Sequence, residues 1–323
     1  MQAIVYTQYG SPDQLRLQDV PTPTIKADEL LIAVRAAGLN AADRYLLRGR
    51  PAMLRFSSGL MRPKQPIPGS DVAGEVVAVG AGVTTFRPGD TVYADLSAGG
   101  RGGLAEFVAA PANMVAPMPA GLSFVEAAAA PMAGVTALQG LRDAGQLRPG
   151  QRVLIAGASG GVGTFAVQIA RALGGEVTAV VSPRNVAQAQ ALGAARVIDY
   201  TAQDFAADGP VYDLVVAVNG RRPINDYRRV LRPGGVYVMV GGEMGQIFQA
   251  LLLGPLLSAR GGGQVRAVSA KPNAADLAAL GEMMAAGQVR PVVERCYPLS
   301  ETAAAFHYME QGHARGKVVI TFA

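Results

Sequence analysis

The stretch Arg152-Val-Leu-Ile-Ala-Gly-Ala-Ser-Gly-Gly-Val-Gly163 begins as an apolar run typical of a buried strand and ends in closely spaced glycines. Gly157, Gly160 and Gly163 are three residues apart, and residues 162–173 have the amphipathic pattern of a helix. The first glycine permits a tight turn, the second lets the backbone approach a bound group, and the third lets helix and strand pack closely. We therefore predict a strand, a glycine turn and a helix in direct succession.

Beyond this stretch the pattern alternates between strands and helices. Strand candidates lie at 153–156, 177–181, 196–199, 214–218, 236–240 and 265–269, and helices separate most of them, for example at 162–173 and 185–192. Such alternation predicts a parallel, doubly wound sheet. In that setting the helix start suits the diphosphate of a dinucleotide. The predicted diphosphate contacts are Gly157, Ser159, Gly160, Gly161, Val162 and Gly163. The alternative is a glycine-rich turn in an α/β domain that binds no nucleotide.

The segment Val181-Ser-Pro-Arg-Asn185 distinguishes between the two nicotinamide dinucleotides. A carboxylate about 20 residues after the glycines would bind the ribose 2′-hydroxyl of NAD, but this segment contains no acid. Ser182 can donate a hydrogen bond, and Arg184 offers a planar fork to a 2′-phosphate, which favours NADPH. A solvated Arg184 is the alternative. Tyr200 either flanks the same pocket or serves as a packing residue.

The first 120 residues or so have another character. Short runs of β-formers at 3–6, 29–36, 74–79 and 90–94 are separated by Gly/Pro turns, which suggests a small barrel or sandwich. Ser123-Phe-Val-Glu126 matches a capping box and introduces an alanine-rich helix. Residues 292–323 return to short strands around one helix. We therefore expect one domain from residues 1–122 and 288–323, and a second, nucleotide-binding domain at 123–287.

Composition excludes several classes of protein. The chain has 323 residues, enough for about two domains. One cysteine, Cys296, and two histidines, His307 and His313, are too few for a structural zinc site with four such ligands, and they make a catalytic zinc of the usual Cys/His type unexpected. No run of 18 apolar residues indicates a membrane span, and no signal peptide is evident. A cytoplasmic address is the default expectation.

The chain resembles the medium-chain dehydrogenase/reductases over essentially its whole length, and within them the quinone oxidoreductases. The similar motifs are Ala37-Gly-Leu-Asn-Ala-Ala-Asp43, Pro68-Gly-Ser-Asp-Val-Ala-Gly-Glu-Val76, Arg87-Pro-Gly-Asp90, the 157–163 glycines and Arg315-Gly-Lys-Val-Val-Ile320. The resemblance implies an α/β protein with a GroES-like barrel as catalytic domain (1–122 and 288–323), a Rossmann domain for NADP (123–287), and an active-site cleft between them.

The resemblance also implies site residues. Zinc-dependent members have Cys at the position of Asn40, His at Ser70 and a third ligand near Ala133, and all three are absent here. A quinone-reductase motif has the same spacing as Asn40, Asp43 and Tyr45. The match implies a positioning role for Asn40, a role for Asp43 in orienting its neighbours, and a substrate contact or proton donation by Tyr45. The alternative for each is an ordinary polar residue at a strand end. The implied cofactor contacts are Thr136, Asn219, Gly241, Gly242 and Lys317, with a surface ion pair as the alternative for Lys317.

The expected activity is hydride transfer from NADPH to a quinone or an α,β-unsaturated carbonyl, without zinc and as a homodimer. One alternative is an NADPH-binding protein with a structural or RNA-related role. The formal net charge of +5 allows that alternative, but the basic residues are scattered along the chain, so no nucleic-acid partner is expected. Another alternative is a metal alcohol dehydrogenase that uses carboxylate ligands. The apolar segment 244–257 is expected in the core or at a subunit interface rather than along a substrate tunnel.

Overall fold

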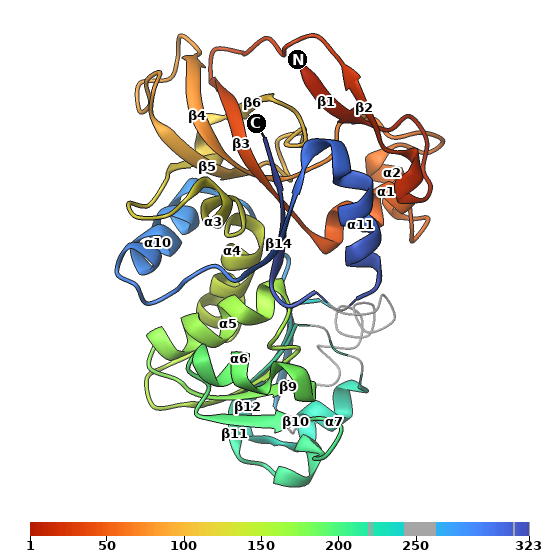
Figure 1. The fold of residues 1–323 in the computed structure, drawn as a ribbon. Coiled ribbons are helices and arrows are strands. Elements are labelled where there is room, and N and C mark those ends of the chain that lie inside the picture. The colour runs from red at the N-terminus through yellow and green to blue at the C-terminus, as the bar shows by residue number, and fades with distance from the viewer. Residues whose placement is uncertain (219, 221, 242–262, 313, 323) are drawn as a thin grey trace. The chain divides into compact units, whose positions relative to one another are not determined.

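The computed structural model describes residues 1–218, 220, 222–241, 263–312 and 314–322. The chain forms two compact units (Figure 1). Unit 1 contains Met1–Ala133, Lys271–Ala285 and Pro291–Ala323, and unit 2 contains Gly134–Ala270 and Ala286–Arg290. The segment 244–257, expected in the core or at an interface, lies outside the described residues.

Unit 2 is built on a six-stranded parallel sheet. In chain order its strands are β8 (Arg152–Ala156), β9 (Glu176–Val181), β10 (Arg196–Asp199), β11 (Tyr212–Ala217), β12 (Leu231–Met239) and β13 (Gln264–Ala267). They lie side by side in the order β10-β9-β8-β11-β12-β13, and every neighbouring pair is parallel. Counted along the chain this is the order 3-2-1-4-5-6 of a Rossmann sheet. The predicted doubly wound sheet is confirmed.

In the described part of unit 2, the α-helices are α5 (Gly161–Ala172), α6 (Val186–Ala191), α7 (Ile224–Arg229) and most of α4 (Pro131–Gln139). Helix α5 buries nearly its whole length from Gly163 to Ala170, and it packs on β8 and β9 (Figure 1). Because β8 and β9 are themselves almost fully buried, they read in the sequence as continuous apolar runs. This packing holds the end of β8 and the start of α5 in a fixed relation.

Unit 1 is built on a mainly antiparallel sheet of seven strands (Figure 1). These strands are β3 (Glu29–Leu39), β4 (Asp71–Val79), β5 (Thr91–Asp95), β6 (Phe107–Pro111), β7 (Val115–Pro117), β14 (Val293–Pro298) and β15 (Lys317–Thr321). Strand β3 pairs with β4 along most of its length, with β6 at its first half and with β15 at its second half. A separate hairpin joins β1 (Gln2–Val5) to β2 (Arg16–Asp19).

Helices α1 (Ala41–Arg48), α2 (Leu54–Ser58), α3 (Phe124–Ala128), α10 (Ala274–Ala285) and α11 (Thr302–Glu310) complete unit 1. Two of them lie in unit 1 although the expected boundaries assign their residues to the other domain. The capping box at Ser123 starts α3 as predicted, but α3 packs closely on β3: a Cβ on Gly38 would lie 2.2 Å from the Ala128 carbonyl oxygen. The Tyr93 hydroxyl donates to the Leu277 carbonyl at 2.5 Å and ties α10 to β5.

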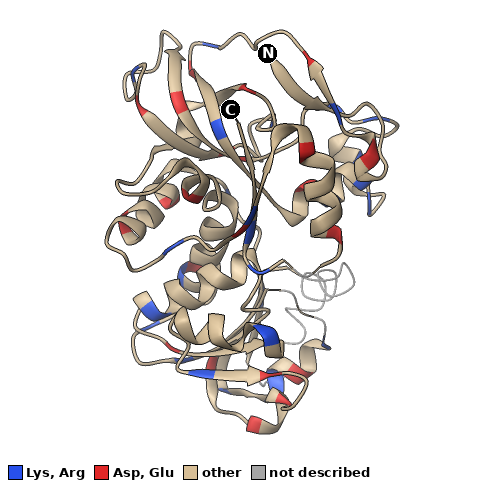
Figure 2. Ribbon diagram, viewed as in Figure 1, with Lys and Arg blue, Asp and Glu red and all other residues tan. Residues whose placement is uncertain are grey.

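Acidic and basic residues are interspersed over the ribbon of each unit (Figure 2). Many of them form local ion pairs, for example Arg196 with Asp208 and Arg48 with Glu310. Within the described ranges, no helix is both long and apolar enough to cross a membrane.

Candidate active site

The glycine turn of unit 2 has the geometry that its sequence predicts. Gly157 adopts a left-handed φ of 80°, which glycine reaches without steric cost. A Cβ on Gly163 would lie 2.1 Å from the Gly157 carbonyl oxygen, so only glycine permits this approach of helix and turn. A Cβ on Gly160 would point into open space, with its nearest neighbour at 3.9 Å. The turn is therefore packed on one side and open on the other.

The open side faces the start of α5, whose first N–H groups have no acceptor within the helix. Gly160 caps that helix, and Gly161 and Val162 form its first turn. Ser159 precedes them in the turn and is half-buried. A concave, glycine-lined backbone at a helix N-terminus suits an anionic diphosphate. The residues present therefore fit a dinucleotide at this turn.

The other predicted nucleotide contacts of unit 2 follow the carboxyl ends of its strands. Ser182 comes directly after β9, where its hydroxyl accepts a hydrogen bond of 2.9 Å from the Asn185 side chain. Arg184 is exposed in the next turn. The Tyr200 N–H, just after β10, donates to the Val181 carbonyl, and its ring is 60% exposed. The structure thus brings Ser182 and Tyr200 to one edge of the sheet, and the exposure of Tyr200 argues against a packing role.

Two further predicted contacts are described by the structure. Gly241 comes shortly after β12, and a Cβ there would lie 2.9 Å from the Val218 carbonyl oxygen. Thr136 is buried in α4. Asn219 and Gly242 lie outside the described residues.

A second site lies in unit 1, where strand register brings three polar residues together. Gly38 on β3 faces Asp71 on β4. On the other side of β3, Leu39 faces Val318 on β15. The next residues outward from this last pair, Asn40 and Lys317, therefore meet at the same end of the sheet as Asp71. Their side chains are all buried.

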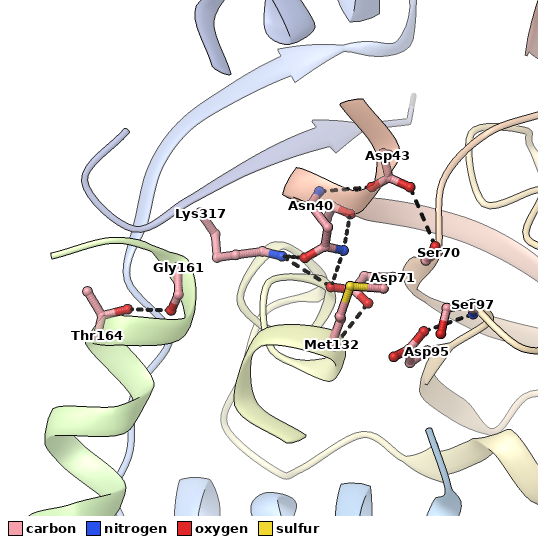
Figure 3. A network of polar contacts seen from close by, with 11 residues as sticks. Asn40, Asp43, Ser70, Asp71, Asp95, Ser97, Met132, Gly161, Thr164 and Lys317 are labelled. Atoms are coloured by element: carbon pink, nitrogen blue, oxygen red, sulfur yellow. Dashed lines mark hydrogen bonds and ion pairs between the residues drawn. The ribbon is translucent and has the colours of Figure 1, made fainter. Parts of the chain in front are cut away.

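These side chains form one hydrogen-bonded network (Figure 3). The Lys317 ammonium donates to Asn40 Oδ1 at 2.5 Å and to Asp71 Oδ2 at 3.1 Å. Asn40 Nδ2 donates to the same Asp71 oxygen at 2.9 Å. The Met132 N–H donates to the other Asp71 oxygen at 3.0 Å. Because Asn40 accepts from a cation and donates to a carboxylate, its amide is held in one orientation.

Asp43 joins this network from the first turn of α1. Its carboxylate accepts from the Asn40 N–H at 2.8 Å and from the Ser70 hydroxyl at 3.5 Å (Figure 3). Asp43 is thus bonded both to the start of its own helix and to the residue before β4. We define Asn40, Asp43, Ser70, Asp71 and Lys317 as the buried polar cluster.

Burial raises the pKa values of the carboxyl groups in and beside the cluster. Burial raises the pKa of Asp43 to about 7, against the hydrogen bond from Asn40, and the nearby charge of Asp71 adds to the effect. Asp95 faces Asp71 across β4 and β5, and burial together with the Asp71 charge raises its pKa to about 6. Burial also raises the pKa of Asp71, although Lys317 and Asn40 act in the opposite direction. Within the cluster, Asp43 therefore keeps its proton to a higher pH than an ordinary aspartic acid does.

Tyr45 lies apart from the hydrogen bonds of the cluster, whereas Lys317 is buried within them. Tyr45 is 38% exposed, and its ring lies 5.1 Å below the Arg44 guanidinium carbon. It is on the same helix as Asp43 but makes no hydrogen bond to the cluster within the described ranges. The side chain of Lys317 is only 3% exposed, so the alternative of a surface ion pair is wrong.

Sequence reasoning missed Asp71 as a site residue. By sequence, Asp71 is only one residue of a family motif, next to Ser70 at a position where zinc-dependent relatives have a ligand. A usable signal was present, because Asp71 precedes the apolar Val-Ala of a strand that must be buried, and a buried carboxylate needs a partner. Lys317 gives a matching indication, because it begins the apolar run Val318–Ile320 and a buried lysine also needs a partner of opposite charge.

Comparison with known proteins identifies the family. The chain matches the alcohol dehydrogenase GroES-like domain over residues 26–120 and the zinc-binding dehydrogenase family over residues 192–320. A chloroplast envelope quinone oxidoreductase homolog of Arabidopsis thaliana is 33% identical, with 99% of this chain and 98% of the relative covered. This chain belongs to the medium-chain dehydrogenase/reductase superfamily. Within it, the chain falls in the quinone oxidoreductase-like branch.

Two further relatives agree with this placement among the medium-chain dehydrogenase/reductases. An NADPH-dependent alkenal/one oxidoreductase of Arabidopsis thaliana is 32% identical, over 99% of this chain and 79% of the relative. The structure of a quinone oxidoreductase from Coxiella burnetii superposes with a TM-score of 0.87 at 32% identity, and 99% of each chain is covered. The expected α/β architecture with a GroES-like and a Rossmann domain is confirmed, and the family uses a nicotinamide cofactor.

A zinc ion, which the name of the matched dehydrogenase family implies, does not fit the residues of this chain. Asn40 and Ser70 stand where zinc-dependent relatives have Cys and His, and neither is a usual zinc ligand. The Lys317 ammonium already bonds to Asn40 and Asp71 and would repel a second cation there. In the described parts of the chain, no three His, Cys, Asp or Glu side chains are grouped to hold a metal ion.

Proposed function

We propose that this chain is a zinc-independent oxidoreductase that transfers hydride from NADPH to a quinone or an α,β-unsaturated carbonyl. One observation carries the proposal: a complete glycine cradle for a dinucleotide occurs in a chain whose zinc-ligand positions hold Asn40 and Ser70, tied to a buried lysine network. The printed names of the relatives, which include quinone and alkenal/one oxidoreductases, support the substrate class.

NADPH is favoured over NADH by the residues after β9. An exposed Arg184 follows that strand, and Ser182 stands where an NAD-specific protein has a carboxylate. The guanidinium fork can hold a 2′-phosphate through paired, charge-assisted hydrogen bonds. Thr136, Asn219, Gly241, Gly242 and Lys317 are proposed as further cofactor contacts on the basis of the family resemblance. A cytoplasmic address and a homodimer stay predictions.

The bound nicotinamide would supply the hydride, and this chain's residues would orient the reactants and stabilise charge. Addition to the β-carbon of an enone leaves an enolate, whose oxygen needs a hydrogen-bond donor. We assign that role to the hydroxyl of Tyr45, a residue that is 38% exposed. Asn40, locked between Lys317 and Asp71, is assigned a positioning role, and Asp43 holds the start of α1. A quinone needs less assistance, because its reduction gains aromaticity.

The proposal is tested by following NADPH absorbance with a panel of quinones and enones. We expect turnover with at least one of these classes, unchanged by a chelator and with no stoichiometric zinc in the purified protein. No turnover with any of them, or activity that tracks zinc content, would overturn the proposal.

Cofactor choice is tested by Arg184→Ala. Loss of the fork should weaken NADPH binding about tenfold or more, with little effect on NADH, because only NADPH carries the 2′-phosphate. Titration of nucleotide fluorescence measures both affinities. The matched control Arg62→Ala removes an exposed arginine of the other unit and should change neither affinity. Equal losses for NADPH and NADH would contradict the assignment.

The role of Tyr45 is tested by Tyr45→Phe. Removal of the hydroxyl should lower kcat for an enone by about tenfold to a hundredfold, since one transition-state donor is lost, and should lower it less for a quinone. Steady-state rates on one substrate of each class decide the matter. If both rates stay at the wild-type level, Tyr45 has no chemical role.

A further inference from the structure

A cavity of about 140 Å³ lies within unit 1, directly beside the buried polar cluster. Asp43 forms part of its wall, so the cavity and the cluster share a residue. Leu46 and Ile67 give it an apolar side. Its volume is close to that of a cavity of ~150 Å³ that holds a benzene ring. The cavity therefore has room for one small ring or a short unsaturated chain.

The polar side of the cavity carries two positive charges. Arg101 and Lys64 both line it, and neither forms an ion pair within the described parts of the chain. Tyr6 lines it as well, and burial raises the pKa of its hydroxyl to about 12, so this group stays a hydrogen-bond donor. The one acid in the wall is Asp43, and its raised pKa lessens the repulsion it would exert on a bound anion.

Arg101 has two features that ordinary packing does not explain. Its backbone adopts a left-handed φ of 63°, which is uncommon for a residue with a side chain and is retained where surrounding structure demands it. Its Nε is buried and has no hydrogen-bond partner among the described residues. A buried donor without a partner costs free energy, so Arg101 places beside the cavity a guanidinium whose hydrogen bonds the described residues leave incomplete.

We propose that this cavity binds the carboxylate end of the substrate, so that the preferred substrates are small enones or quinones that carry an acid group. The proposal rests on the proposed function. Arg101 is the main counter-ion and is assisted by Lys64 and Tyr6, while Leu46 and Ile67 contact the carbon skeleton. Because Asp43 connects the cavity to Asn40, an acid held here lies next to the residue assigned to positioning.

The substrate preference is tested with trans-4-oxopent-2-enoate and its neutral methyl ester. For the wild type, kcat/KM for the acid should exceed that for the ester by about tenfold or more, the worth of a charge-assisted hydrogen bond. In Arg101→Met the ratio should fall toward one. The matched control Arg62→Met removes a nearby exposed arginine that does not line the cavity and should keep the wild-type ratio. An unchanged ratio in Arg101→Met, or no preference in the wild type, would overturn the proposal.

Binding without turnover separates this proposal from the proposed function. Benzoate, which is not reduced, should raise the melting temperature of the wild type and of Arg62→Met with increasing concentration, whereas neutral benzamide should not. Arg101→Met should not respond to benzoate. If Arg101→Met does not fold, Arg101→Gly takes its place, because glycine accepts the left-handed backbone. A wild type that reduces no enone or quinone but responds to benzoate would refute the reaction and keep the site, and equal responses to benzoate and benzamide would refute the site.

Discussion

The glycine cradle of unit 2 and the buried polar cluster of unit 1 are assembled by different means. The cradle is made from backbone, within the short stretch from Gly157 to Gly163, and it works because side chains are missing there. The cluster is made from side chains on or beside three strands and in the first turn of α1, and two of its members, Asn40 and Lys317, are separated by most of the chain. A substitution in the cradle should therefore change the protein through steric clashes with nearby backbone. A substitution in the cluster should change it through the balance of buried charges.

The sharpest test of this contrast is a matched pair of glycine substitutions in the cradle. Gly163→Ala should destabilise the protein by about 3 kcal/mol or more, because its Cβ would lie 2.1 Å from a backbone oxygen that cannot move freely. Gly160→Ala places a Cβ in open space, so its stability loss should stay near ~1 kcal/mol or below. It should still weaken NADPH binding about tenfold or more, since the Cβ occupies the space predicted for the diphosphate.

Urea denaturation and nucleotide titration distinguish the two variants. A Gly160→Ala protein that binds NADPH as tightly as the wild type would show that the open side of the turn is not the nucleotide site. A stable Gly163→Ala protein would show that the helix can move away from the turn, and that the cradle is less rigid than its packing indicates.

The same contrast explains which parts of the fold and of the candidate site can be predicted from the sequence alone. The Rossmann strands and the cradle were predictable, because β8, the glycines and α5 follow one another and each signal is local. Asn40 and Asp43 were named through family spacing, but their link to Asp71 and Lys317 depends on strand register between β3, β4 and β15. The cavity beside Arg101 gave no sequence signal, because its wall combines residues of two short helices, α1 and α2, with residues of separate loops. The left-handed backbone of Arg101 also cannot be read from the sequence. The boundaries of the two units differ from the expected domain boundaries because α3 and α10 pack on the sheet of unit 1.

The cluster predicts a second effect of comparable size, which depends on charge rather than space. Lys317→Met should destabilise the protein by about 3–5 kcal/mol, because Asp71 would be left buried without its cation. The double variant Lys317→Met with Asp71→Asn removes both charges and should recover much of that loss. Free energies of unfolding for the two single variants and the double variant give the coupling directly. Additive losses would mean that the two charges do not stabilise each other, and that the cluster is only a set of packed side chains.

The smallest expected effect is a pH dependence that the cradle lacks. Burial raises the pKa of Asp43 to about 7 in the folded protein, whereas an unfolded chain releases this proton near its ordinary value of ~3.9. Between these two values the folded state holds more protons than the unfolded state, so stability falls as pH rises and levels off above about pH 7. The Asp43 contribution is about 1.4 kcal/mol for each pH unit within this window.

Asp43→Asn removes that contribution while the amide oxygen can still accept from the Asn40 N–H. Asp95 and Asp71 also have raised pKa values, but both are present in the two proteins, so most of their contribution is common to both; the part that comes from the Asp71–Asp43 interaction belongs to the difference. The wild type should therefore lose about 1.4 kcal/mol more than Asp43→Asn between pH 5 and pH 6, as measured by urea denaturation. The control Asp19→Asn changes an exposed carboxylate on β2 and should follow the wild-type slope. If Asp43→Asn shows that slope as well, the Asp43 carboxyl is ionised within the fold, and the cluster carries a second negative charge that Lys317 alone must balance.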